Sequence, residues 1–382
     1  MRMKKYALAA AALGLVYFSS CRTEDTILPP TVTPVDTPSV PTSIIGFYLL
    51  NEGNMGSNKA SLDYYDYTSG LYKQNIYAEA NPTAVKELGD VGNDIRVYGS
   101  KVYAVINVSN RLEIMDVATA KRVKTVEILN CRYVTFANGK AYISSYAGPV
   151  ELDPNAPIGK VIELDTATLN ITREVIVGYQ PEEMAIVGNN LYVANSGGYR
   201  FPNYDSTVSV VDLASFKEIK KINVAINLHR LKADNRGNLY VSSRGDYYTK
   251  PSRLFKIDTK TNTVVKQIDF SVSNLAIAGD TAYLYGTEFN YNTGKTTIAF
   301  NMLDLKTDQL LNKNFITDGT DKGVKMPYGI AINPITKEIF LTDAKDYVSP
   351  GTLYCFGADG VKKWSVTTGD IPAHFAFVYG VK

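Results

Sequence analysis

Short runs of alternating apolar and polar residues follow one another along most of the chain. One unit shows the order clearly, with apolar residues 184–187, a turn at Gly188 and Asn189, and further runs at 191–195 and 208–212. A period of two is typical of strands with one buried face, and Gly and Asn tolerate the positive φ of tight turns. No window beyond the first 20 residues sustains a helical period. The pattern predicts an all-β protein.

This unit recurs along the chain at a nearly constant spacing. Six apolar runs end in an aspartate, and successive separations are 50, 49, 47, 46 and 46 residues: Asp66, Asp116, Asp165, Asp212, Asp258 and Asp304. A tyrosine in the preceding run keeps the same step: Tyr48, Tyr103, Tyr142, Tyr192, Tyr240 and Tyr283. A seventh, more divergent copy has Phe340 at the tyrosine position. Strand units of about 40–50 residues predict propeller blades.

The two ends of the repeat region complement each other. The first copy starts at Ile45 with its second strand, and a matching first strand occurs only at residues 372–378, which resemble residues 181–187. We therefore predict a seven-bladed β-propeller over residues 45–382, whose first blade is completed by the C-terminal strand. Such a ring leaves no open sheet edge. Rings of six or eight blades are the alternatives, because the seventh copy is divergent.

The N-terminal 44 residues have a different character. Basic residues at positions 2, 4 and 5, an apolar stretch at 6–16 and small residues before Cys21 predict a signal peptide over residues 1–20. Cys21 in this place resembles a lipobox cysteine, whose thiol is acylated, although Phe18 replaces the usual Leu. An ordinary cleaved signal is the alternative. The five prolines of residues 22–44 predict that residues 21–44 form a lipidated, disordered tether.

Charge and cysteine content narrow the function further. The chain has 40 basic and 38 acidic residues, and loss of Arg2, Lys4 and Lys5 with the signal leaves 37 against 38. There is no basic block, so nucleic acid is not expected as a partner. Cys131 and Cys355 fall in the third and seventh repeats, too far apart on a ring for a disulfide.

The loops that follow the second strand are long in the third to seventh repeats, at residues 144–158, 195–207, 242–253, 285–295 and 342–351. They are rich in tyrosine, which makes up 27 of 382 residues. Tyr offers a flat contact area with a hydrogen-bonding tip, and such loops are typical of binding surfaces. Packing between blades is the alternative role. The candidate ligand-binding residues here are Tyr146, Asn195, Tyr199, Phe201, Tyr204, Arg244, Tyr247, Glu288, Tyr291 and Tyr347.

A second set of candidates occurs at the start of the first strands, which we expect to lie nearer the ring axis. These residues are Asp94, Arg132, Tyr133, Glu182, His229, Arg230, Asn274, Tyr328 and His374. The two histidines are the only ones in the chain, and no HxH or HxxxH spacing accompanies them. We therefore expect hydrogen-bonded histidines and no metal site.

Enzyme motifs are absent from the sequence. There is no GxSxG, HExxH, CxxC or phosphate-binding loop, so we expect a binding protein, without a cofactor, and not an enzyme. The enzyme alternative is a lactonase-like propeller that holds calcium on its axis through Glu182, Asn274 and Asp94. A third possibility is a surface module that recognises another protein.

The Tyr-Val/Ile-x-Ser/Asn pattern at 142–145, 192–195 and 240–243, with its Gly and Asn turns, resembles the YncE-type seven-bladed propellers over residues 45–382. The whole layout resembles the BtuG family of cell-surface lipoproteins of Bacteroides-type bacteria. The shared features are the lipobox, the acidic residues Glu24 and Asp25 after it, the tether and the Tyr-rich propeller. That resemblance implies a lipid anchor in the outer membrane. It also implies binding of cobalamin, cobinamide or related corrinoids and delivery to a TonB-dependent outer-membrane transporter of the BtuB type.

Overall fold

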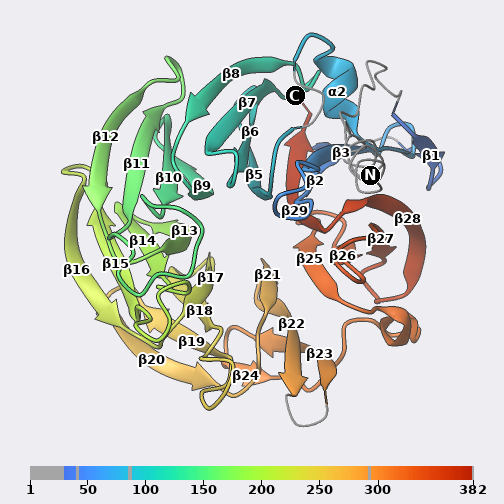
Figure 1. The fold of residues 1–382 in the computed structure, drawn as a ribbon. Helices are drawn as coiled ribbons and strands as arrows, with labels where there is room; N and C mark the ends of the chain where they lie inside the picture. Colours follow the sequence, from blue (N-terminus) through green and yellow to red (C-terminus); the bar gives the residue numbers. More distant parts are fainter. Residues whose placement is uncertain (1–29, 40–42, 85–87, 291–293, 381–382) are drawn as a thin grey trace, which may run out of the picture.

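The computed structural model describes residues 30–39, 43–84, 88–290 and 294–380, which form seven antiparallel sheets arranged in a ring (Figure 1). The predicted seven-bladed β-propeller is confirmed. Helical structure within the described residues is limited to α2 (Ile76–Ala80) and the short 3₁₀ helix η1 (Thr320–Gly323). The signal peptide, Cys21 and Tyr291 lie outside the described residues.

Blades two to seven each contain four strands in chain order from the axis outward. Blade two consists of β5 (Gly92–Tyr98), β6 (Lys101–Ile106), β7 (Arg111–Asp116) and β8 (Arg122–Glu127). Blade three consists of β9 (Cys131–Ala137), β10 (Lys140–Ser145), β11 (Lys160–Asp165) and β12 (Ile171–Ile176). Blade four consists of β13 (Pro181–Val187), β14 (Asn190–Asn195), β15 (Thr207–Asp212) and β16 (Lys217–Asn223). Blade five consists of β17 (Leu228–Ala233), β18 (Asn238–Ser243), β19 (Arg253–Asp258) and β20 (Thr263–Ile268). Blade six consists of β21 (Asn274–Ala278), β22 (Thr281–Asn290), β23 (Lys295–Asp304) and β24 (Gln309–Leu310). Blade seven consists of β25 (Pro327–Ile332), β26 (Ile339–Asp343), β27 (Pro350–Phe356) and β28 (Lys362–Asp370).

Blade one joins the two ends of the chain. Its innermost strand is β29 (Pro372–Tyr379), which pairs with β2 (Ile44–Asn51), and β3 (Ser61–Asp66) and β4 (Leu71–Lys73) follow outward. Closure of the first blade by the C-terminal strand is thus confirmed, and the ring has no unpaired inner strand.

Part of the expected tether belongs to the fold. β1 (Val32–Pro34) adds a fifth strand to blade one by pairing with β4, with Val32 opposite Lys73. The Val35 amide continues the contact by donating to the Gly70 carbonyl at 3.0 Å. The expectation of disorder through residue 44 was therefore wrong for this segment. Its backbone groups satisfy the outer edge of the short β4, which would otherwise lack partners.

The repeated aspartates end strands β3, β7, β11, β15, β19 and β23 because they close the next turn. The Asp165 carboxylate accepts the Thr168 amide at 2.7 Å, and Asp212 accepts the Ser215 amide at 2.7 Å. Side chains of this length bond to backbone amides two or three residues ahead and fix a tight turn. The spacing read from the sequence is therefore a spacing of turns.

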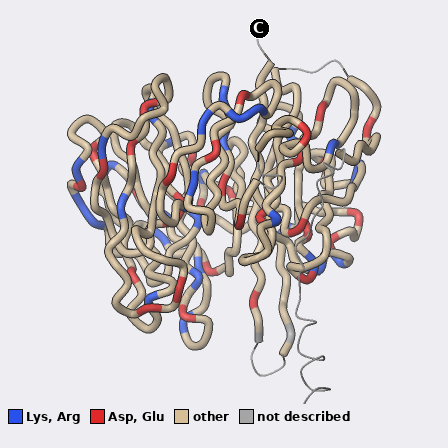
Figure 2. Tube along the Cα trace, turned by 45° about the horizontal axis from the view of Figure 1, so that its top comes forward, with Lys and Arg blue, Asp and Glu red and all other residues tan. Residues whose placement is uncertain are grey.

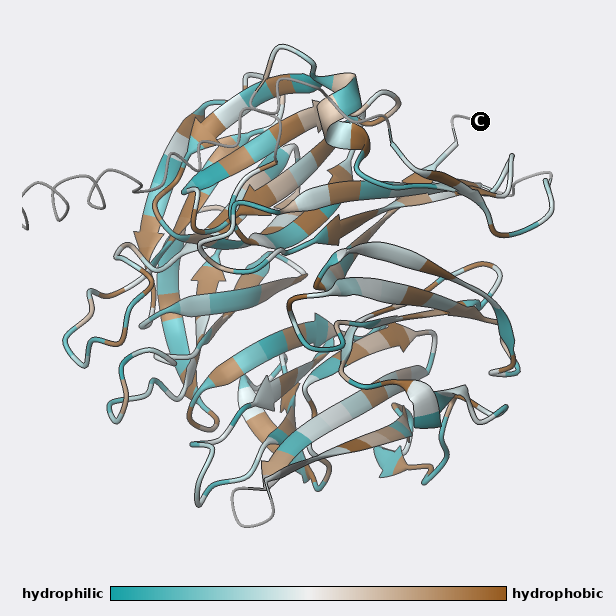
Figure 3. Cartoon of the chain, turned by 45° about the vertical axis from the view of Figure 1, so that its right-hand side comes forward, coloured by the Kyte–Doolittle hydropathy of each residue, from teal (hydrophilic) through white to brown (hydrophobic). Residues whose placement is uncertain are grey.

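The repeated tyrosines fasten neighbouring blades together. The hydroxyl of Tyr48 donates to the Val117 carbonyl of blade two at 2.9 Å. The Tyr240 hydroxyl donates to Asp308 of blade six, also at 2.9 Å. The rings of Tyr48 and Tyr240 are buried while their hydroxyls keep a partner, as is usual for buried tyrosines, whereas the buried Tyr103 hydroxyl has no hydrogen-bond partner. Hydrophobic residues alternate along the strands, and the loops are more hydrophilic (Figure 3).

Aromatic residues fill the joint between blades one and seven. The Phe47 ring of β2 lies 4.7 Å from Phe340 of β26, centroid to centroid. Phe375 and Phe377 of β29 lie 5.6 and 5.9 Å from Phe47. The last strand thus closes the ring by apolar packing as well as by backbone pairing. No helix among the described residues is long and apolar enough to cross a membrane.

Candidate functional site

The seven innermost strands begin at one rim, and their first residues meet around the axis (Figure 1). Tyr133 of blade three reaches His229 of blade five, with 3.0 Å between the Tyr133 hydroxyl and His229 Nε2. Arg230 Nη1 donates to the same hydroxyl at 3.1 Å. Three of the predicted axial residues, from two blades that are not neighbours, therefore form one hydrogen-bonded group.

Glu182, on β13, is the anionic centre of this rim. Its carboxylate accepts Arg132 Nη2 at 3.1 Å, Arg244 Nη1 at 3.3 Å and the Tyr146 hydroxyl at 2.5 Å. The residue is 1% exposed. Burial raises the pKa of Glu182, but Arg132 and Arg244 outweigh it, so the pKa lies below its usual value. Glu182 is thus ionised and fully paired.

The next residue, Glu183, forms a second charge cluster. It pairs with Arg96 at 3.3 Å and with Lys232, and it also accepts the Leu231 amide at 3.0 Å. Burial alone would raise its pKa, but Lys232, Arg230 and Arg96 together lower it to about 2. This cluster lines a small axial cavity of about 170 Å³.

A third cluster was not predicted in full, because it depends on Glu52. The Glu52 carboxylate lies 2.9 Å from His374 Nε2 and accepts the Tyr328 hydroxyl at 2.8 Å. Tyr328 and His374 were candidates, whereas the sequence around Glu52 has only the Gly and Asn signals of a turn.

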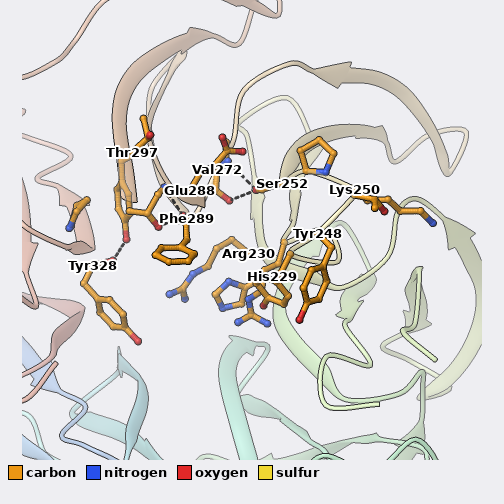
Figure 4. Close-up of a pocket in the computed structure, with 18 of the residues that line it drawn as sticks. His229, Arg230, Tyr248, Lys250, Ser252, Val272, Glu288, Phe289, Thr297 and Tyr328 are labelled. Carbon is orange, nitrogen blue, oxygen red and sulfur yellow. Dashed lines mark hydrogen bonds between the residues drawn. The ribbon is translucent and has the colours of Figure 1, made fainter. Parts of the chain in front are cut away.

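The main cavity opens beside the axis, between blades five, six and seven, and has a volume of about 710 Å³ (Figure 4). Seven of the predicted residues line it: His229, Arg230, Arg244, Tyr247, Glu288, Tyr328 and Tyr347. Its other lining residues are Tyr248, Thr249, Lys250, Pro251, Ser252, Val272, Ser273, Tyr285, Thr287, Phe289, Thr297 and Pro327.

The remaining candidates lie elsewhere. Asn195 is buried inside blade four, where its Nδ2 donates to Thr207 and Ser209 at 3.0 and 2.9 Å. Arg132, Tyr133, Tyr146 and Glu182 belong to the axial network, and Asp94, Asn274 and His374 line the small axial cavity. Tyr199, Phe201 and Tyr204 lie on the blade-four loop, outside the main cavity.

The wall contributed by blade six differs from the predicted loop of residues 285–295. β22 continues to Asn290 and β23 starts at Lys295, so most of this region is strand, and Figure 2 shows the hairpin extending beyond the neighbouring loops. Tyr285, Thr287, Glu288 and Phe289 of β22 line the cavity. Phe289 is one of the aromatic residues of the predicted loop but was not among the candidate ligand-binding residues. The Thr, Tyr and Phe residues of β22 favour strand structure in this segment.

The cavity wall combines aromatic faces with neutral and cationic donors. The Tyr328 and Tyr347 rings lie 5.9 Å apart in an edge-to-face arrangement. Burial lowers the pKa of His229 well below its usual value, and Arg244 and Arg230 lower it further, so the imidazole is neutral at pH 7. Such a wall can hold a large amphipathic molecule by stacking and hydrogen bonding.

Glu182, Asn274 and Asp94, the calcium ligands expected for a lactonase-like propeller, are engaged in other contacts. Glu182 is paired with arginines, Asp94 accepts the Val134 amide at 3.1 Å, and the Asn274 amide donates to the Tyr328 carbonyl at 3.0 Å. Within the described ranges, no group of three His, Cys, Asp or Glu side chains is placed to hold a metal ion.

A family model described as a domain of unknown function, DUF5074, matches residues 45–370. The chain belongs to this family. None of the curated proteins matches the chain.

Solved structures with the same fold come from proteins of diverse kinds. A quinonprotein alcohol dehydrogenase-like protein from Bacteroides thetaiotaomicron has a TM-score of 0.58 at 15% identity, over 87% of this chain and 78% of that one. Kuenenia stuttgartiensis hydrazine synthase has a TM-score of 0.55 at 15% identity, over 70% of this chain and 77% of that one. The computationally designed protein Ika8 has a TM-score of 0.53 at 9% identity, over 91% of this chain and 92% of that one. At these identities the likeness establishes the propeller fold alone.

Proposed function

We propose that this propeller is a cell-surface binding protein that captures a corrinoid, such as cobalamin, in the cavity between blades five, six and seven. The observation that carries the proposal is the cavity itself. It has about 710 Å³ of space, and six of its lining residues are tyrosine or phenylalanine: Tyr247, Tyr248, Tyr285, Phe289, Tyr328 and Tyr347. Small-molecule sites are concave, of this size and rich in aromatic side chains.

The chemistry of a corrinoid suits this wall. A corrin ring is a broad apolar disc with amide side chains around its edge. Aromatic faces such as those of Phe289 and Tyr347 supply flat contact area for the disc. Hydroxyl groups of Ser273, Thr287 and Thr297 border the same space and can pair with the amides.

Capture would be followed by transfer, without covalent chemistry. The signal-like N-terminus and Cys21 favour a lipid anchor, and the proposed receiver is a TonB-dependent outer-membrane transporter. The cavity opens beside the axis, so a bound corrinoid would stay accessible to such a partner. Transfer can be tested by co-purifying the lipidated protein with a cobalamin transporter from the same organism, with and without corrinoid.

Binding is tested directly by calorimetry of purified residues 22–382 with cyanocobalamin and with cobinamide. This chain length keeps β1, which a protein starting at residue 43 would lose. We expect saturable one-to-one binding at micromolar concentration or tighter. Absence of heat and of a visible absorbance change with both compounds would overturn the proposed function.

A further inference from the structure

Arg230 occupies an unusual position between the two cavities. It is the third residue of β17, and its side chain borders both the main cavity and the small axial one. Although it is a cation, the residue is only 7% exposed. In Figure 4, Arg230 lies with His229 and Phe289 at the centre of the opening.

The hydrogen-bonding capacity of Arg230 is largely unused. Nη1 donates to the Tyr133 hydroxyl, and the guanidinium lies 5.6 Å from the centroid of the Tyr133 ring. Nε is buried and has no hydrogen-bond partner. Across the described parts of the chain, Arg230 forms no ion pair, whereas the nearby Arg132 and Arg96 are paired with Glu182 and Glu183. Glu183 acts on Arg230 through space but forms no ion pair with it, and the buried Nε keeps no hydrogen-bond partner, which favours an anionic occupant that can pair with the guanidinium directly.

The charge of the surrounding wall points the same way. The cavity is lined by three cations, Arg230, Arg244 and Lys250, and by one carboxylate, Glu288. Glu288 is occupied by the Ser271 hydroxyl. Arg244 reaches Glu182 by one contact of 3.3 Å and still borders the cavity. An anion at this place would therefore meet a net positive wall.

We propose that the inner end of the main cavity is an oxyanion subsite, in which Arg230, with Arg244 beside it, binds a phosphate or carboxylate group of the ligand. A guanidinium matches the two oxygens of such a group by paired hydrogen bonds. The inference rests on the proposed function for its ligand. Among corrinoids, the oxyanion is the phosphodiester of the nucleotide loop, which cobalamin has and cobinamide lacks.

The first test compares cyanocobalamin with cobinamide on the unaltered protein by calorimetry, and then on Arg230→Gln. We expect the unaltered protein to bind cobalamin about tenfold or more tightly than cobinamide, since charge-assisted pairs are the stronger hydrogen bonds. Arg230→Gln should remove that preference and leave cobinamide affinity nearly unchanged. Arg236→Gln is the matched control, because Arg236 lies in the turn at the opposite end of β17 and pairs with Asp280.

The outcomes separate the two proposals. Equal affinity for both corrinoids on the unaltered protein would overturn the oxyanion subsite, even where Arg230→Gln fails to fold, and would leave corrinoid binding in place. An equal loss for both corrinoids in Arg230→Gln would also overturn it. If neither corrinoid binds, the proposed function fails. The oxyanion subsite is then tested separately, by comparing the binding of phenyl phosphate with that of phenol in saturation-transfer NMR. If phenyl phosphate binds and Arg230→Gln abolishes this binding, the oxyanion subsite is supported. If phenyl phosphate and phenol bind equally well, the oxyanion subsite is overturned.

Discussion

Tyr133 and His229 meet across the middle of the ring, with 3.0 Å between the tyrosine hydroxyl and His229 Nε2, although they belong to blades three and five. Arg230 donates to the same hydroxyl, so one tyrosine fixes two residues of the cavity wall. A wall held in this way loses little conformational freedom when a ligand arrives, which favours tight binding.

The neutral state of His229 predicts a loss of stability in mild acid. Its folded pKa lies below the unfolded value of about 6.5, so below that pH the unfolded chain takes up a proton that the folded protein refuses. The free energy of unfolding should therefore fall between pH 7 and pH 5, by up to about 1.4 kcal/mol per pH unit. Urea denaturation at both values, on the unaltered protein and on His229→Gln, measures this. Identical pH dependence in the two proteins would contradict the prediction.

Removing the charge of Glu182 should destabilise the propeller strongly. Glu182→Gln leaves Arg132, whose side chain is 11% exposed, without its carboxylate, and breaking a buried pair from one side costs about 3–5 kcal/mol. Chemical denaturation measures the loss. Glu151→Gln, at an exposed position, serves as the control and should leave the midpoint unchanged. A Glu182→Gln midpoint equal to that of the control would show that the pair is dispensable.

The aromatic joint between blades one and seven should be a major source of stability. Phe47→Ala removes a fully buried ring that contacts Phe340, Phe375 and Phe377, and we expect a loss of about 3–5 kcal/mol. Ile219→Ala, on the outer strand β16, removes an exposed side chain and should have little effect. Thermal and urea unfolding of both variants test this. Equal stabilities would mean that the joint contributes little to closure.

Aromatic residues of the cavity should contribute to corrinoid binding. Phe289→Ala and Tyr347→Ala should each weaken binding roughly tenfold, the loss of about 1–2 kcal/mol typical of a buried aromatic contact. Tyr379→Ala is the control, since Tyr379 is 56% exposed and ends β29 at the rim away from the cavity. Calorimetry measures all three. Corrinoid affinity unchanged by both cavity variants would place the ligand elsewhere.

The fold could be predicted from the sequence because its signals are local and repeated. Each aspartate such as Asp165 marks a turn, and each tyrosine such as Tyr240 marks a second strand, so the count of blades follows from counting residues. The closing strand could be predicted because residues 372–378 repeat a first-strand pattern that the N-terminal copy lacks. β1 could not, since Val32–Pro34 is a Pro-flanked segment whose partner, β4, has only three residues.

The site was predictable only in part. Residues at the start of the inner strands share a register, so Tyr133, His229 and Arg230 could be grouped in advance. Which arginine is paired depends on contacts between blades that no single strand encodes. Arg132 forms an ion pair with a carboxylate 50 residues away, whereas Arg230 forms no ion pair with any residue that the structure describes. In the hairpin of blade six, Glu288 was a candidate and Phe289 was not, because the sequence does not show which residues of this segment face the cavity.

The pairing of β2 with β29 has a consequence for how the protein reaches its native state. Glu52 and His374 form a hydrogen-bonded contact although they lie 322 positions apart in the sequence; His374 belongs to the paired strand β29, and Glu52 directly follows β2. Blades two to seven are each built from consecutive segments and can form as the chain emerges during synthesis. Blade one has to wait for β29, so the inner edge of β2 stays unpaired until that last strand is available.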